Sequence, residues 1–137
     1  MQESNKMRSL VLIAASCILA TATAAAADDS QRWFESGSKL TQQTGEGIYN
    51  AVCAGCHMPD GAGAVGGGLY PALAGNAALT APDRSIYITL HGQGAMPPLG
   101  ALLDDQQVAD VVNYIRTAFG NAFADPAATP EMVSAAR

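Results

Sequence analysis

Basic residues are scarce in this sequence. Its seven Lys and Arg residues stand against twelve Asp and Glu residues, which gives a net charge of −5 at pH 7. Beyond residue 27, five basic residues remain against eleven acidic ones, a charge of about −6. A nucleic-acid-binding protein needs a basic surface that faces the phosphates. The charge balance therefore excludes a nucleic-acid partner.

The sequence also lacks a hydrophobic run long enough to cross a membrane. Its most apolar stretch, residues 10–20, follows two basic residues and falls short of the ~20 residues that a spanning helix needs. Small residues then lead to Ala25–Ala27, an A-x-A cleavage site. We therefore expect residues 1–27 to be a cleaved signal peptide that exports the protein to the periplasm. The mature chain would then form one domain without a transmembrane segment; a retained N-terminal anchor is the alternative.

Cysteine is scarce as well. Cys17 lies in the apolar part of the expected signal peptide, so only Cys53 and Cys56 remain in the mature chain. With two residues between them, these cysteines close too small a loop for a useful stabilising disulfide. We therefore expect them to have a chemical role.

Three kinds of site use a C-x-x-C sequence. A zinc site needs four ligands, and only His57 and the distant His91 are left to complete one. A thioredoxin-like pair precedes a helix, whereas residues 58–75 predict neither a helix nor a strand. The third kind is covalent haem c, in which two thiols add to the haem vinyl groups and the adjoining imidazole binds the iron. The sequence C-x-x-C-H therefore predicts one haem c on Cys53 and Cys56, with His57 as an iron ligand.

Two helices are expected to enclose this cofactor. Before the cysteines, residues 41–57 read as a helix with Gly45 and Tyr49 on the same face as Cys53. Because glycine within a helix costs roughly 1 kcal/mol, we expect Gly45 to permit the close crossing of a second helix. Tyr114 is the candidate to meet it.

The second helix lies within residues 102–121. Asp104 can cap it, Gln107 occupies the capping-box position, and Gly120 follows its end. Its apolar stripe is expected to comprise Val108, Val111, Val112, Ile115 and Phe119.

The segment between these helices is rich in glycine, alanine and proline. No G-K-[ST] sequence follows the glycines, so residues 59–79 do not form a phosphate-binding loop. We expect this segment to wrap around the macrocycle. A short helix should follow from about Pro82 to Leu90, with Ile86 facing inward.

A sixth iron ligand has four candidates. Met58 adjoins the proximal histidine and cannot reach the opposite face of the ring, and Met132 lies in the tail beyond the last helix. Met96 lies on a loop between helices that two prolines stiffen. We therefore predict Met96 as the distal ligand, with His91 as the alternative. The ordinary role of His91 would be hydrogen bonding at a helix end.

Taken together, residues 41–120 resemble the class I c-type cytochromes. The resemblance rests on the Gly45–Tyr49–Cys53 spacing with C-A-G-C-H, on L-Y-P-A-L at residues 69–73, on Met96-Pro97-Pro98 and on the V-A-D-V-V-N-Y-I helix. It implies an all-α fold, with N- and C-terminal helices crossing around one covalent haem. It also implies that the Pro71 carbonyl orients His57 through its ring N–H.

Residues 91–121 look most like cytochromes or cytochrome subunits that serve periplasmic flavin- or quinone-dependent dehydrogenases. The chain departs from the lysine-rich mitochondrial type, because Lys39 is the one lysine beyond the expected signal peptide. A partner that recognises a basic patch is therefore not expected.

The expected function is one-electron transfer. With both axial positions filled, the iron has no ready site for oxygen or peroxide. The protein would accept electrons from a dehydrogenase and pass them through a downstream cytochrome or oxidase to the respiratory chain, as a free carrier or a dehydrogenase subunit and not as an enzyme. The alternative is a haem enzyme or gas sensor with a labile sixth ligand.

The two ends of the chain carry less information. Residues 28–40, with Trp33 and Phe34, are expected to form an N-terminal extension to the domain at residues 41–120. Residues 121–137 are rich in alanine and proline and are expected to form a flexible, loosely held tail.

Overall fold

The computed structural model describes residues 34–36, 39–66 and 68–137. The predicted signal peptide and Trp33 lie outside these residues. Within them, no helix is both long enough and apolar enough to span a membrane.

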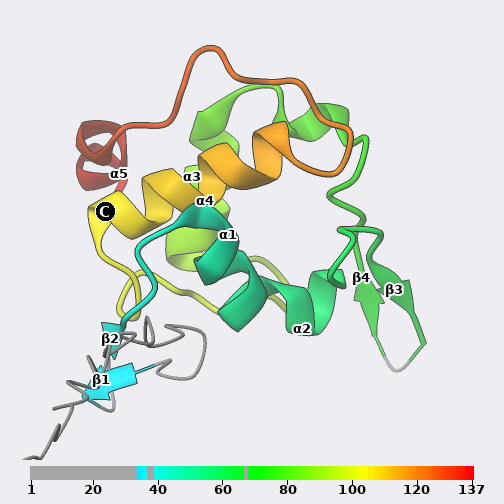
Figure 1. The fold of residues 1–137 in the computed structure, drawn as a ribbon, viewed down its shortest axis with the longest axis horizontal. Coiled ribbons are helices and arrows are strands. Elements are labelled where there is room, and N and C mark those ends of the chain that lie inside the picture. The colour runs from blue at the N-terminus through cyan, green and yellow to red at the C-terminus, as the bar shows by residue number, and fades with distance from the viewer. Residues whose placement is uncertain (1–33, 37–38, 67) are drawn as a thin grey trace, which may run out of the picture.

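One helix, α4 (Asp105–Thr117), runs through the middle of the molecule. Figure 1 shows the shorter helices around it, and α1 (Gly45–Ile48), α3 (Pro82–His91) and α5 (Pro130–Ala136) all pack against it. Each of the four therefore buries one face against a neighbour, as amphipathic helices must.

The N-terminal helical segment comprises three elements. After α1 the chain forms a π-helical turn, η2 (Tyr49–Cys53), and then α2 (Ala54–His57). Thr44 caps the start of α1, because the Thr44 side-chain oxygen accepts a hydrogen bond from the Gly47 amide at 3.1 Å. The predicted helix is thus present from Gly45 onward, with a π-helical turn that the sequence did not predict.

Helix α4 begins as predicted. The Asp104 carboxylate accepts a hydrogen bond from the Gln107 amide at 2.8 Å, and the Gln107 side chain accepts one from the Asp104 amide at 3.0 Å. The helix ends at Thr117, however, so the placement of Phe119 in its apolar stripe was wrong. Phe119 has a φ of +57° and lies in the turn beyond the helix, where its ring still packs on Tyr49 at 4.9 Å between centroids.

The predicted crossing of the two helices is confirmed. A Cβ atom placed on Gly45 would lie 2.3 Å from the Asp110 carbonyl oxygen and 2.7 Å from the Tyr114 Cβ. Only glycine therefore allows the two backbones to come this close. The rings of Tyr49 and Tyr114 lie 5.6 Å apart beside this point and extend the contact.

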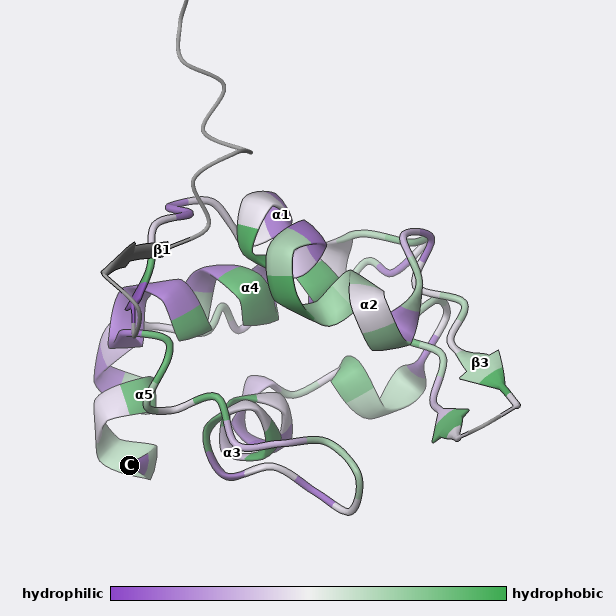
Figure 2. Cartoon of the chain, turned by 90° about the horizontal axis from the view of Figure 1, so that it is seen from below, coloured by the Kyte–Doolittle hydropathy of each residue, from purple (hydrophilic) through white to green (hydrophobic). Residues whose placement is uncertain are grey.

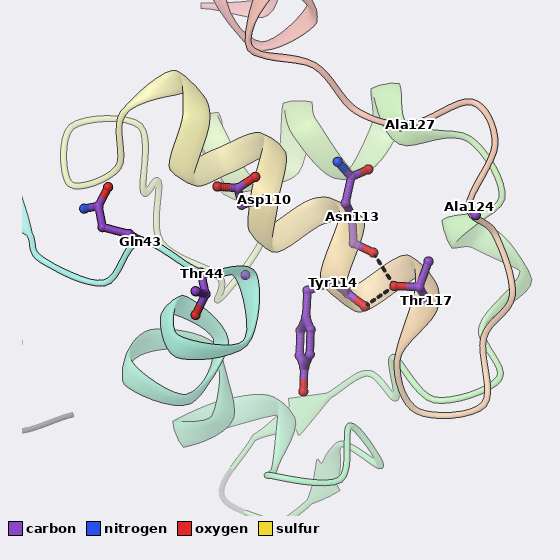
Figure 3. Close-up of a pocket in the computed structure, with 9 residues that line it drawn as sticks. Gln43, Thr44, Asp110, Asn113, Tyr114, Thr117, Ala124 and Ala127 are labelled. Atoms are coloured by element: carbon purple, nitrogen blue, oxygen red, sulfur yellow. Dashed lines mark hydrogen bonds between the residues drawn. The ribbon is translucent and has the colours of Figure 1, made fainter. Parts of the chain in front are cut away.

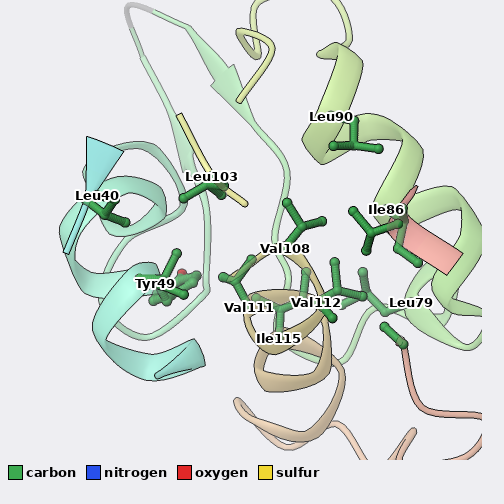
Figure 4. Packing of buried hydrophobic residues seen from close by; sticks show 14 residues of the cluster. Leu40, Tyr49, Leu79, Ile86, Leu90, Leu103, Val108, Val111, Val112 and Ile115 are labelled. Carbon is green, nitrogen blue, oxygen red and sulfur yellow. The ribbon is translucent and has the colours of Figure 1, made fainter. Parts of the chain in front are cut away.

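The hydrophobic core lies on both sides of α4. Figure 4 shows the α4 side chains between Leu40 and Tyr49 on one side and Ile86, Leu90 and Leu79 on the other. The buried apolar α4 side chains in this core include Val108, Val111, Val112 and Ile115, as predicted, and also Ala109, which was not. The inward orientation predicted for Ile86 is also confirmed, since 1% of it is exposed.

Two short hairpins accompany the helices. Strand β1 (Phe34–Ser36) pairs antiparallel with β2 (Lys39–Leu40), and β3 (Ala64–Val65) pairs antiparallel with β4 (Leu69–Tyr70). The second hairpin corrects the expectation that residues 58–75 form neither a helix nor a strand, and the 3-10 turn η3 (Ala77–Leu79) follows it. Figure 2 shows the β3–β4 hairpin standing away from the helices.

The C-terminal segment is packed, in contrast to the loosely held tail that its composition suggested. Val133 of α5 is fully buried, and the 121–137 segment is bound to α4 by two hydrogen bonds between Asn113 and the Ala128 backbone, at 2.8 and 2.9 Å. Alanine and proline contribute little hydropathic pattern, and the segment is held in place by the burial of Ala128 and Val133 and by these hydrogen bonds. The prediction of a loosely held tail, which was based on composition alone, was therefore wrong.

Arg116 joins this segment to the rest of the domain. Its guanidinium is buried and donates to the carbonyl oxygens of Leu79, Thr80 and Pro126 at 2.9, 2.9 and 2.6 Å. Burial lowers the pKa of Arg116 from its usual value, and the carboxylates of Asp125 and Asp83 oppose that shift.

We expect Gly45→Ala to lower the free energy of unfolding by about 1–3 kcal/mol, because the added methyl group overpacks the helix crossing. Gly55→Ala is the matched control on the same helical segment, since a Cβ there meets nothing within 4 Å. The control should lie within about 0.5 kcal/mol of the parent or be slightly more stable. Chemical denaturation of both variants measures this, and equal stabilities would contradict the crossing.

Candidate haem site

The C-x-x-C-H residues lie at the end of the N-terminal helical segment. Cys53 closes η2, and Cys56 and His57 lie in α2, one helical turn further on. Both cysteines are free thiols, Cys53 partly buried and Cys56 exposed. Burial, with a smaller contribution from the nearby Cys56, raises the pKa of the Cys53 thiol to about 12, so this thiol is protonated at neutral pH. The helix therefore presents two thiols and an imidazole along one side.

The imidazole of His57 is oriented by a backbone carbonyl. Its Nδ1 lies 2.9 Å from the Pro71 carbonyl oxygen. A carbonyl only accepts hydrogen bonds, so Nδ1 carries the proton and donates it, which leaves the Nε2 lone pair for a metal. This is the contact that the resemblance implied; the roles of His57 and Pro71 at a haem stay predictions.

A close approach of two backbone segments brings Pro71 to His57. The Gly63 amide donates to the His57 carbonyl at 3.0 Å, and Gly63 has a φ of +68°. A Cβ on Gly63 would lie 2.3 Å from the Tyr70 carbonyl oxygen. Glycine at this position thus lets the β3–β4 hairpin fold back against the end of α2.

Tyr49 supports the turn that follows His57, a role that sequence reasoning missed. Its hydroxyl donates to the Met58 carbonyl at 2.7 Å, and Met58 itself has a φ of +65°. Burial raises the pKa of Tyr49 to about 12, with smaller contributions from Cys53, Tyr114 and Asp60. Tyr49 therefore remains a hydrogen-bond donor at physiological pH. The signal was its position one helical turn before Cys53.

Met96 lies on the loop between α3 and α4. Met96 and Gln93 exchange two backbone hydrogen bonds of 3.0 Å, which close a tight turn. Gly92 has a φ of +75°, and a Cβ atom added there would lie 2.5 Å from the Met96 carbonyl oxygen, which is too close. The loop then returns to α3, where the Leu99 amide donates to the Thr89 carbonyl at 2.9 Å.

The other candidates for the sixth ligand have different surroundings. The Nε2 of His91 lies 2.8 Å from the Ala136 carbonyl oxygen, and its ring packs on Tyr87 at 4.6 Å. This is the hydrogen-bonding role at a helix end that the sequence suggested as its ordinary one. Met132 packs partly buried against the core from α5.

The structure thus brings four of the five predicted site residues together: Cys53, Cys56, His57 and Pro71. Met96 occupies a separate loop, which has backbone–backbone hydrogen bonds within its own turn and, where the loop returns, to α3.

The donor set fits haem c. Two thiols one turn apart, an imidazole with its Nε2 left for iron and a thioether on a constrained loop are the groups that this cofactor requires. Apolar side chains from the same elements remain only partly buried while they pack on the core: Val52, Leu73, Leu99 and Leu102. A flat apolar ring would complete their burial.

A separate hollow of about 580 Å³ lies elsewhere on the molecule. Figure 3 shows it between the start of α1, the side of α4 that carries Asp110 and Tyr114, and the chain at Ala124 and Ala127. None of the predicted haem-binding residues lines it.

Comparison with known proteins agrees with this donor set. The profile of the family described as "Cytochrome C oxidase, cbb3-type, subunit III" matches residues 41–115. The gluconate 2-dehydrogenase cytochrome c subunit of Pantoea cypripedii is 43% identical over 93 residues, which are 58% of this chain and 21% of that protein. The fructose dehydrogenase cytochrome subunit of Gluconobacter japonicus is 37% identical over 103 residues, 64% of this chain and 21% of that protein.

A smaller relative is matched over more of its length. A cytochrome c-552 of Thermus thermophilus is 37% identical over 102 residues, 63% of this chain and 67% of that protein. The chain thus spans about a fifth of the length of the two dehydrogenase subunits and about two thirds of this cytochrome. These matches confirm the predicted resemblance, the class I cytochrome c fold and haem c as the cofactor. Since the profile covers more than half of its residues, the chain belongs to this family of cytochrome c domains.

Proposed function

We propose that this protein is a periplasmic one-electron carrier that accepts electrons from a dehydrogenase and passes them toward the respiratory chain. As a cytochrome c it transfers electrons through haem; the location, the direction of flow and the partners are what the proposal adds. The observation that carries the role of the haem in this proposal is the contact between His57 Nδ1 and the Pro71 carbonyl, at the end of the helix that bears both thiols. This contact holds the imidazole in the tautomer that binds iron.

The chain's own residues favour electron exchange over catalysis. Cys53 and Cys56 would hold the haem covalently, while His57 and Met96 would occupy the two axial positions. The haem supplies an iron that changes by one electron between its ferrous and ferric forms. A thioether ligand favours the ferrous form and raises the potential. With both positions filled by side chains, no site is left for a substrate, which supports a role as carrier and not as enzyme.

The dehydrogenase partner is suggested by the relatives. Two of them are named as cytochrome subunits of gluconate and fructose dehydrogenases. We propose a flavin- or a quinone-dependent dehydrogenase as the electron donor and a cytochrome or oxidase as the acceptor. A haem enzyme or gas sensor with a labile sixth ligand is the alternative, and carbon monoxide binding to the reduced protein separates the two.

The covalent attachment is tested by substituting the thiols. In a host that matures c-type cytochromes, the parent protein should keep its haem stain on a denaturing gel, whereas Cys53→Ser/Cys56→Ser should lose it, because no thioether bond remains. Cys17→Ser is the control and should stain like the parent, since Cys17 lies in the expected signal peptide. A colourless parent band, or a stained double variant, would disprove the attachment.

The distal ligand is tested by Met96→Ala. The variant should bind carbon monoxide when reduced, and its potential should fall by a fraction of the roughly 0.8 V over which axial ligands set haem potentials. Met132→Leu is the control, because Met132 packs against the core from α5 and should leave both properties unchanged. Optical spectra and potentiometry measure the outcome. If Met96→Ala behaved like the parent, the assignment would pass to His91.

A further inference from the structure

The loop that carries Met96 is held at both ends by the last residue of α5 and the residue that follows it. At the start of the loop, His91 Nε2 lies 2.8 Å from the Ala136 carbonyl oxygen. At its end, Arg137 donates from Nη1 to the Gly100 carbonyl at 2.6 Å and from Nη2 to the Leu103 carbonyl at 2.9 Å. Two adjacent residues therefore bridge the points where the loop leaves α3 and where it approaches α4.

The Arg137 guanidinium presents its N–H donors as a planar fork, and this Arg137 fork has a third contact. Its Nε lies 2.5 Å from the Asp105 carboxylate, at the first residue of α4. The ion pair is about one-third exposed, so solvent weakens it as a source of stability. Its geometry matters more: one planar guanidinium fixes two carbonyls and a carboxylate at once, which a lysine ammonium cannot do with the same directionality.

Helix α5 is itself firmly anchored. Val133 is fully buried, and Thr129 caps the helix by accepting a hydrogen bond from the Met132 amide at 3.3 Å. Asn113 of α4 bonds to both backbone groups of Ala128, just before the helix. The loop, in contrast, has hydrogen bonds to α3 at its return, where the Gly100 amide lies 3.2 Å from the Leu90 carbonyl. Side chains add two long contacts of 3.4 Å, from Lys39 to the Ala101 carbonyl and from Arg84 to the Gln93 side chain, and the shorter hydrogen bonds of 2.6 and 2.9 Å come from Arg137, which follows α5.

We propose that α5, through Arg137, is a positioning device that keeps the Met96 loop in its ligand-bearing conformation and so controls how readily the sixth iron position opens. This proposal rests on the proposed function, in which Met96 is the distal ligand. Without the Arg137 fork, the loop end at Gly100 and Leu103 loses its link to α5. Met96 then leaves the iron more often, and an external ligand enters more readily.

The test measures carbon monoxide binding to the reduced holoprotein in the parent, Arg137→Lys, Glu131→Gln and Met96→Ala. Arg137→Lys keeps the charge and loses the fork, and should bind carbon monoxide roughly three- to tenfold faster than the parent, as expected for the loss of about one net hydrogen bond. Glu131→Gln is the control on the exposed side of the same helix and should match the parent. Met96→Ala sets the rate for a fully open position.

A second readout separates positioning from general stability. The far-red charge-transfer band of thioether-ligated ferric haem should weaken with temperature in Arg137→Lys well below the midpoint of global unfolding, and should stay intact in Glu131→Gln. If Arg137→Lys binds carbon monoxide at the parent rate while Met96→Ala binds it readily, the α5 proposal is overturned and the ligand assignment stands. If Met96→Ala itself is unchanged, both fail.

Discussion

The close crossing of the N-terminal helical segment over α4 at Gly45 is the constraint on which the rest of the structure depends. It fixes where this segment ends, and the segment ends with Cys53, Cys56 and His57. From the same segment, Tyr49 reaches the Met58 carbonyl and holds the turn beyond the histidine. A single residue without a side chain thus positions the groups that we propose to bind the haem.

Beyond the helices, the site is built mainly from backbone groups on uncharged loops. A carbonyl orients the histidine, and tight glycine turns hold both the β3–β4 hairpin and the Met96 loop. Residues 61–82 and 92–103 contain no charged side chain, although the whole chain is acidic. With Met96 as the proposed ligand, neutral surroundings of this kind would leave the charge of ferric haem uncompensated and would add to the effect of the thioether in favouring the ferrous state.

Local signals in the sequence predicted the parts of the fold that depend on local chemistry. The sequence predicted the capping box at Asp104 and Gln107, and it predicted the helix crossing at Gly45. Each has a short-range physical cause. The π-helical turn and the turn at Phe119 were not predicted, since neither has a short-range pattern in the sequence, and the Phe119 ring packs on the distant Tyr49. Helix α5 was missed for the same reason: a seven-residue helix that starts with a proline and ends with two alanines has no strong pattern, and burial of Val133 depends on neighbours far along the chain.

The central claim is that the protein carries one electron on a haem whose two axial positions are both filled. Coulometric titration of the purified holoprotein, followed by its visible spectrum, tests this most directly. The account predicts reversible uptake of one electron per chain at a single potential, with a reduced spectrum that carbon monoxide leaves unchanged. Reversible uptake of any other number of electrons, or a reduced spectrum that shifts at once under carbon monoxide, would contradict it.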